Sequence, residues 1–172
     1  VSDPASPSIA ARAKSGPGWD LAVRHDRVYL ARKAAGMAVY SVADPLAPAL
    51  VEQVSPGGEI VTVARRGAVL AVGAEDGRIW LYDITGVPLL LGQIQAQGEL
   101  WRVRFYAGQL WVLGRNADWV EVWNVDTPPD PARLGAFTVG AAHWFRGRFQ
   151  GDRLYTFTGR SVQAHQVTPA GL

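Results

Sequence analysis

The segment Asp3-Pro-Ala-Ser-Pro7 returns 41 residues later as Asp44-Pro-Leu-Ala-Pro48, and this return decides the fold. Looser versions follow at Thr85-Gly-Val-Pro88 and Pro128-Pro-Asp-Pro131, and another boundary falls at Val167-Thr-Pro169. A fixed period of about 40 to 45 residues, built from short strands, is typical of the blades of a β-propeller. The chain is therefore predicted to be all-β, a single propeller domain of about four four-stranded antiparallel blades.

The repeat predicts where the units and their strands lie. The units span approximately residues 3–43, 44–85, 86–126 and 127–168. Each contains one strand after the proline-rich boundary, a second after a glycine turn, an apolar third and a closing fourth. The predicted first strands are Ile9–Ala13, Ala49–Val54, Leu89–Ile94 and Ala132–Val139. The second strands alternate in polarity, and we expect Leu21, Thr62, Val103 and Gly147 to share one position on a face that packs against the next blade.

Composition limits the class of protein. The chain has 172 residues, of which 48% are hydrophobic, enough for the core of one domain. The formal net charge of +2 is too small to predict nucleic-acid binding. Without cysteine, disulfides and thiol catalysis are excluded. No apolar stretch approaches the roughly 18 residues of a membrane span. Since the chain opens with Val1 and no leader, we expect a processed protein or a piece of a longer one.

The repeated motifs resemble known propeller families. The Asp-Pro-x-x-Pro boundaries, the strand Val28-Tyr-Leu-Ala31 and the closing pattern Gly-x-x-Val-Tyr-x-Val resemble the LVIVD class of repeat. The segments Glu75–Ile84 and Trp119–Val125 are similar to WD40 blades, although the Gly-His pair of that pattern is missing. The resemblance implies a binding platform, commonly a protein-interaction scaffold. In the LVIVD case it implies a cell-surface or secreted setting.

Four units leave three arrangements open. The chain closes alone as a four-bladed ring, two copies meet as halves of an eight-bladed ring, or the units belong to a longer polypeptide. An open arc would expose apolar end faces and unpaired edge strands. Because the chain starts and ends at equivalent points of the repeat, we expect no strand exchange between the first and last blades.

Arginines provide the candidate binding site. Arg102 and Arg104 alternate on the second strand of unit three, and Arg146 and Arg148 hold the equivalent positions in unit four. Four guanidinium groups facing one region could bind a phosphate or carboxylate, because the planar fork matches such groups bidentately. Alternatively, the arginines pair with nearby acids (Glu99, Asp118 or Glu121) or form a partner-binding face.

The other reactive side chains give weaker signals. Trp144 is a candidate contact residue, because the inward position of its strand falls on Phe145. The remaining tryptophans of the second half are expected to pack between blades. The three histidines have no metal-ligand spacing, and Glu75-Asp76 reads as a solvated turn. We predict no catalytic residue, metal or cofactor.

These observations favour a non-enzymatic protein-interaction scaffold or structural subunit. The expected partner is another protein or a second copy of the chain. The alternative is an enzyme or binding protein for a small anionic ligand held by the Arg-rich strands of units three and four.

Overall fold

A computed structural model shows an all-β chain. It describes residues 9, 11–115, 119–138, 146–150, 153–157 and 162–166, and gives only the backbone at 146–150, 156, 157 and 163. Within this part of the chain there are fifteen strands and no helix. Hydrogen-bonded neighbours in every sheet are antiparallel.

The strands form four sheets that follow one another along the sequence. Sheet 1 contains β1 (Asp20–Arg24), β2 (Arg27–Ala31), β3 (Met37–Ser41) and β4 (Ala49–Val54). Sheet 2 contains β5 (Ile60–Arg66), β6 (Val69–Ala74), β7 (Arg78–Asp83) and β8 (Leu89–Gln95). Sheet 3 contains β9 (Leu100–Tyr106), β10 (Gln109–Gly114), β11 (Trp119–Asn124) and β12 (Ala132–Thr138). Sheet 4 has three described strands, β13 (Arg146–Gln150), β14 (Arg153–Phe157) and β15 (Val162–Gln166).

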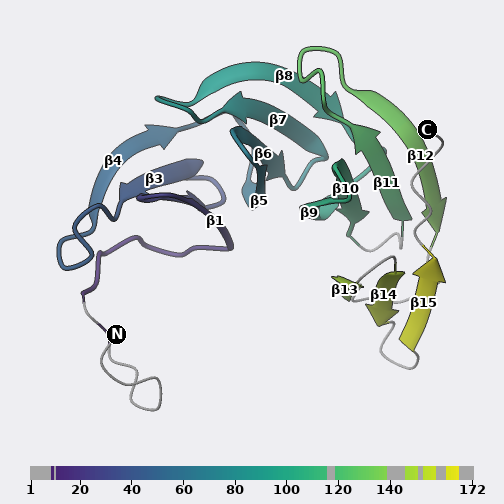
Figure 1. The fold of residues 1–172 in the computed structure, drawn as a ribbon, viewed down its shortest axis with the longest axis horizontal. Coiled ribbons are helices and arrows are strands. Elements are labelled where there is room, and N and C mark those ends of the chain that lie inside the picture. Colours follow the sequence, from purple (N-terminus) through teal and green to yellow (C-terminus); the bar gives the residue numbers. More distant parts are fainter. Residues whose placement is uncertain are drawn as a thin grey trace.

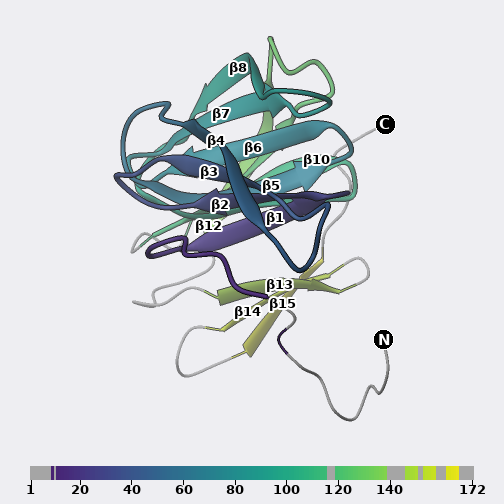
Figure 2. The same cartoon turned by 90° about the vertical axis from the view of Figure 1, so that its left-hand side faces the viewer.

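The sheets are arranged as the blades of a propeller. Figure 1 shows them along an arc, with β1, β5 and β9 on its inner side and β4, β8 and β12 on its outer rim. Sheets 1 and 4 lie at the two ends of this arc, and the side view in Figure 2 shows β13–β15 set apart from the other strands. The predicted fold class is confirmed.

Sheets and sequence repeats are offset by one strand. The strand that follows a proline-rich boundary pairs with the last strand of the preceding unit, so that β4 lies beside β3 and β8 beside β7. Each boundary is therefore a hairpin loop inside a sheet. Its first turn is the same in each case, because Ser41, Asp83 and Asn124 accept on a side-chain oxygen the N–H two residues ahead, at 3.4, 2.7 and 2.8 Å.

The expected first strand of unit one is not formed. Ile9 and residues 11–19 contain no strand, and Ile9 is exposed. By the repeat, this segment is equivalent to β4, β8 and β12, which are the outermost strands of their sheets. Its place would be beside β15, where sheet 4 has no fourth strand among the described residues.

Three apolar clusters fill the spaces between successive sheets. Tyr29 and Met37 of sheet 1 pack in one cluster with Leu70 and Trp80 of sheet 2. A second cluster joins sheets 2 and 3, and a third brings Leu154 of sheet 4 against sheet 3. Burying an aliphatic side chain of this kind contributes about 1.5–3 kcal/mol. Trp80, Trp111 and Trp119 are buried, which confirms their expected packing role.

The strand register changes one predicted alignment. Val63 pairs with Val72 as Leu21 pairs with Leu30 and Val103 with Val112, so Val63 and not Thr62 takes the position equivalent to Leu21 and Val103. Thr62, predicted for that position, is instead buried toward the inner edge, where its hydroxyl contacts the neighbouring inner strands. Equivalent residues of these strands are thus 42 and 40 positions apart rather than a constant 41, and because neighbouring residues of a strand face opposite sides, an alignment that is off by one residue changes the predicted face.

Candidate functional site

The arginine pair of unit three lies on β9, the innermost strand of sheet 3 (Figure 1). Arg104 forms an ion pair with Asp20 of β1, which belongs to sheet 1. Its Nη1 donates to Asp20 Oδ2 at 2.9 Å and its Nη2 to Oδ1 at 3.3 Å. This two-point contact joins residues 84 positions apart in the sequence. It uses the guanidinium face that would otherwise grip an anionic ligand.

Thr62 sits between the two charged residues. Its hydroxyl donates to Asp20 Oδ2 at 2.7 Å and accepts from the Val103 N–H at 3.2 Å. The Val63 N–H also donates to Asp20 Oδ2, at 3.2 Å. We call Asp20, Thr62 and Arg104 the inner triad. Its contacts link β1, β5 and β9, so they fix the relative positions of the innermost strands of three successive sheets.

The surroundings of Asp20 stabilise its charged form. Burial by itself raises the pKa of Asp20, but hydrogen bonds from Arg104 and Thr62 and the charges of Arg104 and Arg102 outweigh that effect. The pKa of Asp20 therefore lies below its ordinary value. The charged form is the one that the triad stabilises, and the pair is neutral as a unit.

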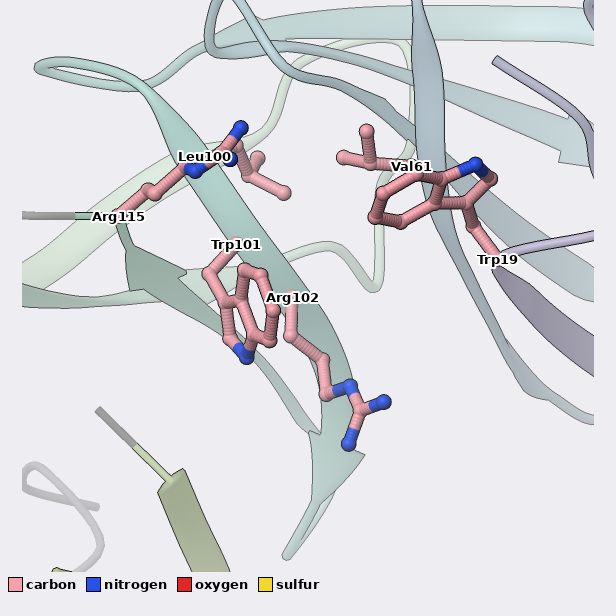
Figure 3. A pocket seen from close by; sticks show the side chains of 6 residues that line it. All are labelled: Trp19, Val61, Leu100, Trp101, Arg102 and Arg115. Atoms are coloured by element: carbon pink, nitrogen blue, oxygen red, sulfur yellow. The ribbon is translucent and has the colours of Figure 1, made fainter. Parts of the chain in front are cut away.

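Arg102 has a different environment. It lines a small cavity with Trp19, Val61, Leu100, Trp101 and Arg115. Figure 3 shows Trp19 and Val61 on one side of this space and the β9 residues on the other. The cavity measures about 30 Å³, room for a water molecule or two. It is too small to enclose an organic ligand.

The other predicted site residues are only partly described. Arg146 pairs with Phe157 and Arg148 with Tyr155 in the backbone register of sheet 4. Their side chains, and all of Trp144, lie outside the described part of the structure. A meeting of the four arginines stays a prediction. Of the acids expected to pair with them, Glu121 instead accepts from Trp123 Nε1 at 3.1 Å and Arg133 at 3.2 Å, and Asp118 lies outside the described residues.

Other arginines also link neighbouring sheets. Arg24 of sheet 1 donates to the Ile84 carbonyl of sheet 2 at 2.7 Å, and Arg65 of sheet 2 donates back to the Val23 carbonyl. Arg66 of sheet 2 reaches Asp126 of sheet 3 at 2.7 Å. Arginines from sheets 1 and 2 thus join neighbouring blades.

A charge cluster at another edge of the sheets corrects one prediction. Lys33 Nζ lies 3.0 Å from Glu59 and 3.4 Å from Glu75, and Arg115 also pairs with Glu75. Glu75 is therefore a half-buried link between three sheets rather than a solvated turn residue. Only Asp76 behaves as expected, pairing with its neighbour Arg78 at 2.6 Å.

Sheet 1 carries an uncovered apolar face. Strand pairing places Leu21 beside Leu30, and Val23 beside Val28, Tyr40 and Leu50. We call these side chains the leading face of sheet 1: Leu21, Val23, Val28, Leu30, Tyr40 and Leu50. Leu21, Val23 and Leu50 are exposed, Leu21 by 58%, while Val28 and Leu30 are half-buried and Tyr40 is buried. The counterparts of Leu21, Val28 and Leu30 in sheets 2 and 3 are buried against the preceding sheet. Leu90, the counterpart of Leu50 on β8, is 53% exposed, so Leu50 does not distinguish sheet 1 from sheet 2.

The described residues show neither a group of metal-ligating side chains nor a helix able to cross a membrane. His25 occupies a turn with φ of 51°, and the ring of His165 lies 5.8 Å from that of Phe137.

Comparison with known proteins defines the class of fold. No family profile matches the sequence, and no curated protein matches it. The computationally designed protein Ika4 superposes with a TM-score of 0.70 at 12% identity, covering 95% of this chain and 99% of that chain. The designed Ika8 superposes at 0.66 and 16% identity, covering 86% of this chain and 45% of that one.

Two of the similar structures are natural proteins. Sqt1 of Saccharomyces cerevisiae superposes at a TM-score of 0.64 and 16% identity, covering 89% of this chain and 47% of that one. The WD40 β-propeller domain of Doa1 gives 0.65 at 13% identity, with 91% and 54% covered. The fold is thus a WD40-like β-propeller. This chain spans about half the length of Ika8, Sqt1 and the Doa1 domain. No LVIVD protein is among these structures, so that finer resemblance stays a prediction.

Proposed function

We propose that this chain is a protein-interaction scaffold of the WD40-like propeller type, which binds other polypeptides on the surfaces of its blades. The observation that carries the proposal is the leading face of sheet 1. An apolar sheet face of this kind marks a protein-binding surface when it is left in contact with water. The likeness to WD40 propellers supports the proposal, and one similar structure, at a TM-score of 0.61 and 16% identity, is that of the Mitotic Checkpoint Complex.

The mechanism is rigid display. The inner triad and the apolar clusters hold successive sheets in fixed relation, so a partner meets a preformed surface and little ordering accompanies binding. Loops at the strand ends then add recognition to the apolar contact.

The anionic-ligand alternative has less support. Arg104 already contacts Asp20, and the cavity beside Arg102 is only about 30 Å³. For a ligand to use both guanidinium groups, it would have to displace a buried carboxylate.

Site-specific photo-crosslinking tests the proposal. We would replace Leu21 with p-benzoylphenylalanine and express the chain in its native host. The matched control carries the same group at Leu89, which is 64% exposed on β8, at the outer rim of sheet 2. The scaffold proposal predicts a defined protein adduct from position 21 that is absent from position 89. The absence of protein adducts at position 21, together with a melting temperature raised by phosphate or sulfate and lost in Arg102→Ala, would favour the anion-binding alternative.

A further inference from the structure

The leading face of sheet 1 has the composition of a blade interface. Leu21, Leu30 and Val28 of this face hold the repeat positions of Val63, Val72 and Leu70 in sheet 2, and of Val103, Val112 and Leu110 in sheet 3. All six counterparts are at most 1% exposed, because each lies against the preceding sheet. Leu21, the counterpart of Val63, is 58% exposed. The face is thus built to receive another blade, and among the described residues no sheet precedes sheet 1.

At the opposite end of the arc, the described residues of sheet 4 lack a fourth strand. Sheets 1 to 3 each take their outermost strand from the segment after a proline-rich boundary. Sheet 4 ends at β15 in the described residues, and the segment around Ile9 and Ala11, which has the same sequence pattern, forms no strand. The chain therefore offers one unpaired strand segment at the first end and one incomplete sheet at the last.

The two ends complement each other, but they do not meet within one chain. In Figure 1, sheets 1 and 4 lie at opposite ends of the arc. The arc also superposes on part of Ika8, Sqt1 and the Doa1 domain, at 45%, 47% and 54% of their lengths. Its sheets thus follow one another as they do in about half of a propeller twice as long.

We propose that two copies of this chain close head to tail into one eight-bladed ring, each with its leading face against sheet 4 of the other. In the same contact, the segment around Ile9 and Ala11 of each copy becomes the fourth strand of the other copy's sheet 4. A head-to-tail contact gives a closed ring when the rotation that relates the copies divides a full turn. Two copies that each form half of a ring meet that condition. This inference rests on the proposed function, since it names the partner of the same surface.

The register of the exchanged strand follows from the repeat. In sheet 3, Trp123 pairs with Arg133 and Val122 with Gly135. The equivalent residues of β15 are His165 and Ala164, and those of the N-terminal segment are Ile9 and Ala11. Ala11 should therefore lie opposite Ala164 of the other copy. Both residues are alanines, so replacing each with cysteine adds only a thiol to a small side chain.

Solution mass is the first part of the test. The purified full chain should give about 37 kDa by light scattering at several concentrations, twice the mass of the 18.6 kDa chain. Leu21→Glu should reduce this to the single-chain mass with the β-sheet circular dichroism retained, while Leu89→Glu should leave the pair intact. A wild-type chain that stays at 18.6 kDa, or a Leu21→Glu variant that stays paired, overturns the proposal.

A disulfide identifies the chain that donates the strand. The sequence has no cysteine, so the double variant Ala11→Cys with Ala164→Cys contains only the engineered thiols. On mild oxidation we expect a covalent two-chain species on a non-reducing gel, and Ala11→Cys with Leu89→Cys serves as the unmatched control. A disulfide within one chain would mean that the four blades close alone, which overturns the proposal and leaves the scaffold function standing. A photo-adduct from position 21 to a different protein, with the chain itself monomeric, has the same meaning.

Discussion

Replacing Asp20 with alanine removes the acceptor shared by three inner strands. The Thr62 hydroxyl, the Val63 N–H and the Arg104 guanidinium all donate to this carboxylate. The side chain of Asp20 is 10% exposed, whereas that of Arg104 is 35% exposed. The contact therefore lies between the interior and solvent, and Arg104 can turn toward water after the acid is lost.

These exposures set the expected magnitude. A hydrogen bond that involves a charged group contributes about 1.5–3 kcal/mol, and loss of one partner from a fully buried ion pair costs about 3–5 kcal/mol. Because Arg104 regains hydration, we expect Asp20→Ala to lower the free energy of unfolding by about 2–3 kcal/mol. Asp20→Asn keeps an oxygen that can accept from Thr62 but loses the charge, so it should cost about half as much.

Urea unfolding at pH 7, followed by tryptophan fluorescence at one fixed chain concentration, measures this change. Asp26→Ala is the matched control, because Asp26 is exposed in the turn between β1 and β2, and it should change stability by less than about 0.5 kcal/mol. If Asp20→Ala unfolds at the same urea concentration as Asp26→Ala, the inner triad does not hold the sheets together and the reasoning fails.

Three further predictions concern pH, packing and salt. Because the pKa of Asp20 is lowered in the folded chain, its stabilisation is complete above the unfolded value of about 3.9 and is lost as pH falls through the lower folded value; the stability gap between wild type and Asp20→Asn should close below about pH 3.9 in acid titrations. Gly114→Ala should lower the melting temperature through about 1–3 kcal/mol of overpacking, since its Cβ would lie 2.2 Å from Trp119 Cε2, whereas Gly135→Ala, with open space around it, should not. Glu75→Gln should cost less than about 1 kcal/mol in urea unfolding, and this cost should disappear in 1 M salt, because its ion pairs are partly exposed; a cost that persists in salt would contradict a screened surface role.

The period predicted the fold because it reports where strands and turns recur, and β4 begins and ends where the sequence placed it. A sequence period does not show at which strand each sheet begins. The same spacing results whether a blade starts at Asp44 or at Ile60, and the choice depends on which strands pair across the boundary. That choice is made by the hairpin after β3, where Ser41 accepts from the Ala43 N–H and starts a turn that brings β4 back beside β3.

The candidate site was only partly predictable. Arg104 was recognised as unusual, but its partner was sought among nearby acids. The partner, Asp20, is two units away, and contacts between inner strands follow the curvature of the arc rather than the sequence. One signal was available in the repeat itself, since Asp20 and the two arginines on β9 occupy neighbouring inner-strand positions with opposite charge. The position of Thr62 beside Asp20 had no such signal, because a fixed period of 41 residues aligns Thr62 with Leu21 and so predicts the other face of β5.

The uncovered face of sheet 1 was also visible in the sequence in part. Leu21 follows the same alternation as its buried counterparts Val63 and Val103, and alternation alone cannot say whether a neighbouring blade is present. Exposure in the folded arc makes that distinction.

Electron cryo-microscopy of the purified chain, with the blades counted in class averages, tests the central claim most directly. The account predicts closed rings of eight blades with two-fold symmetry, in which each sheet has four strands. A closed ring of four blades, or a solitary open arc, would contradict it.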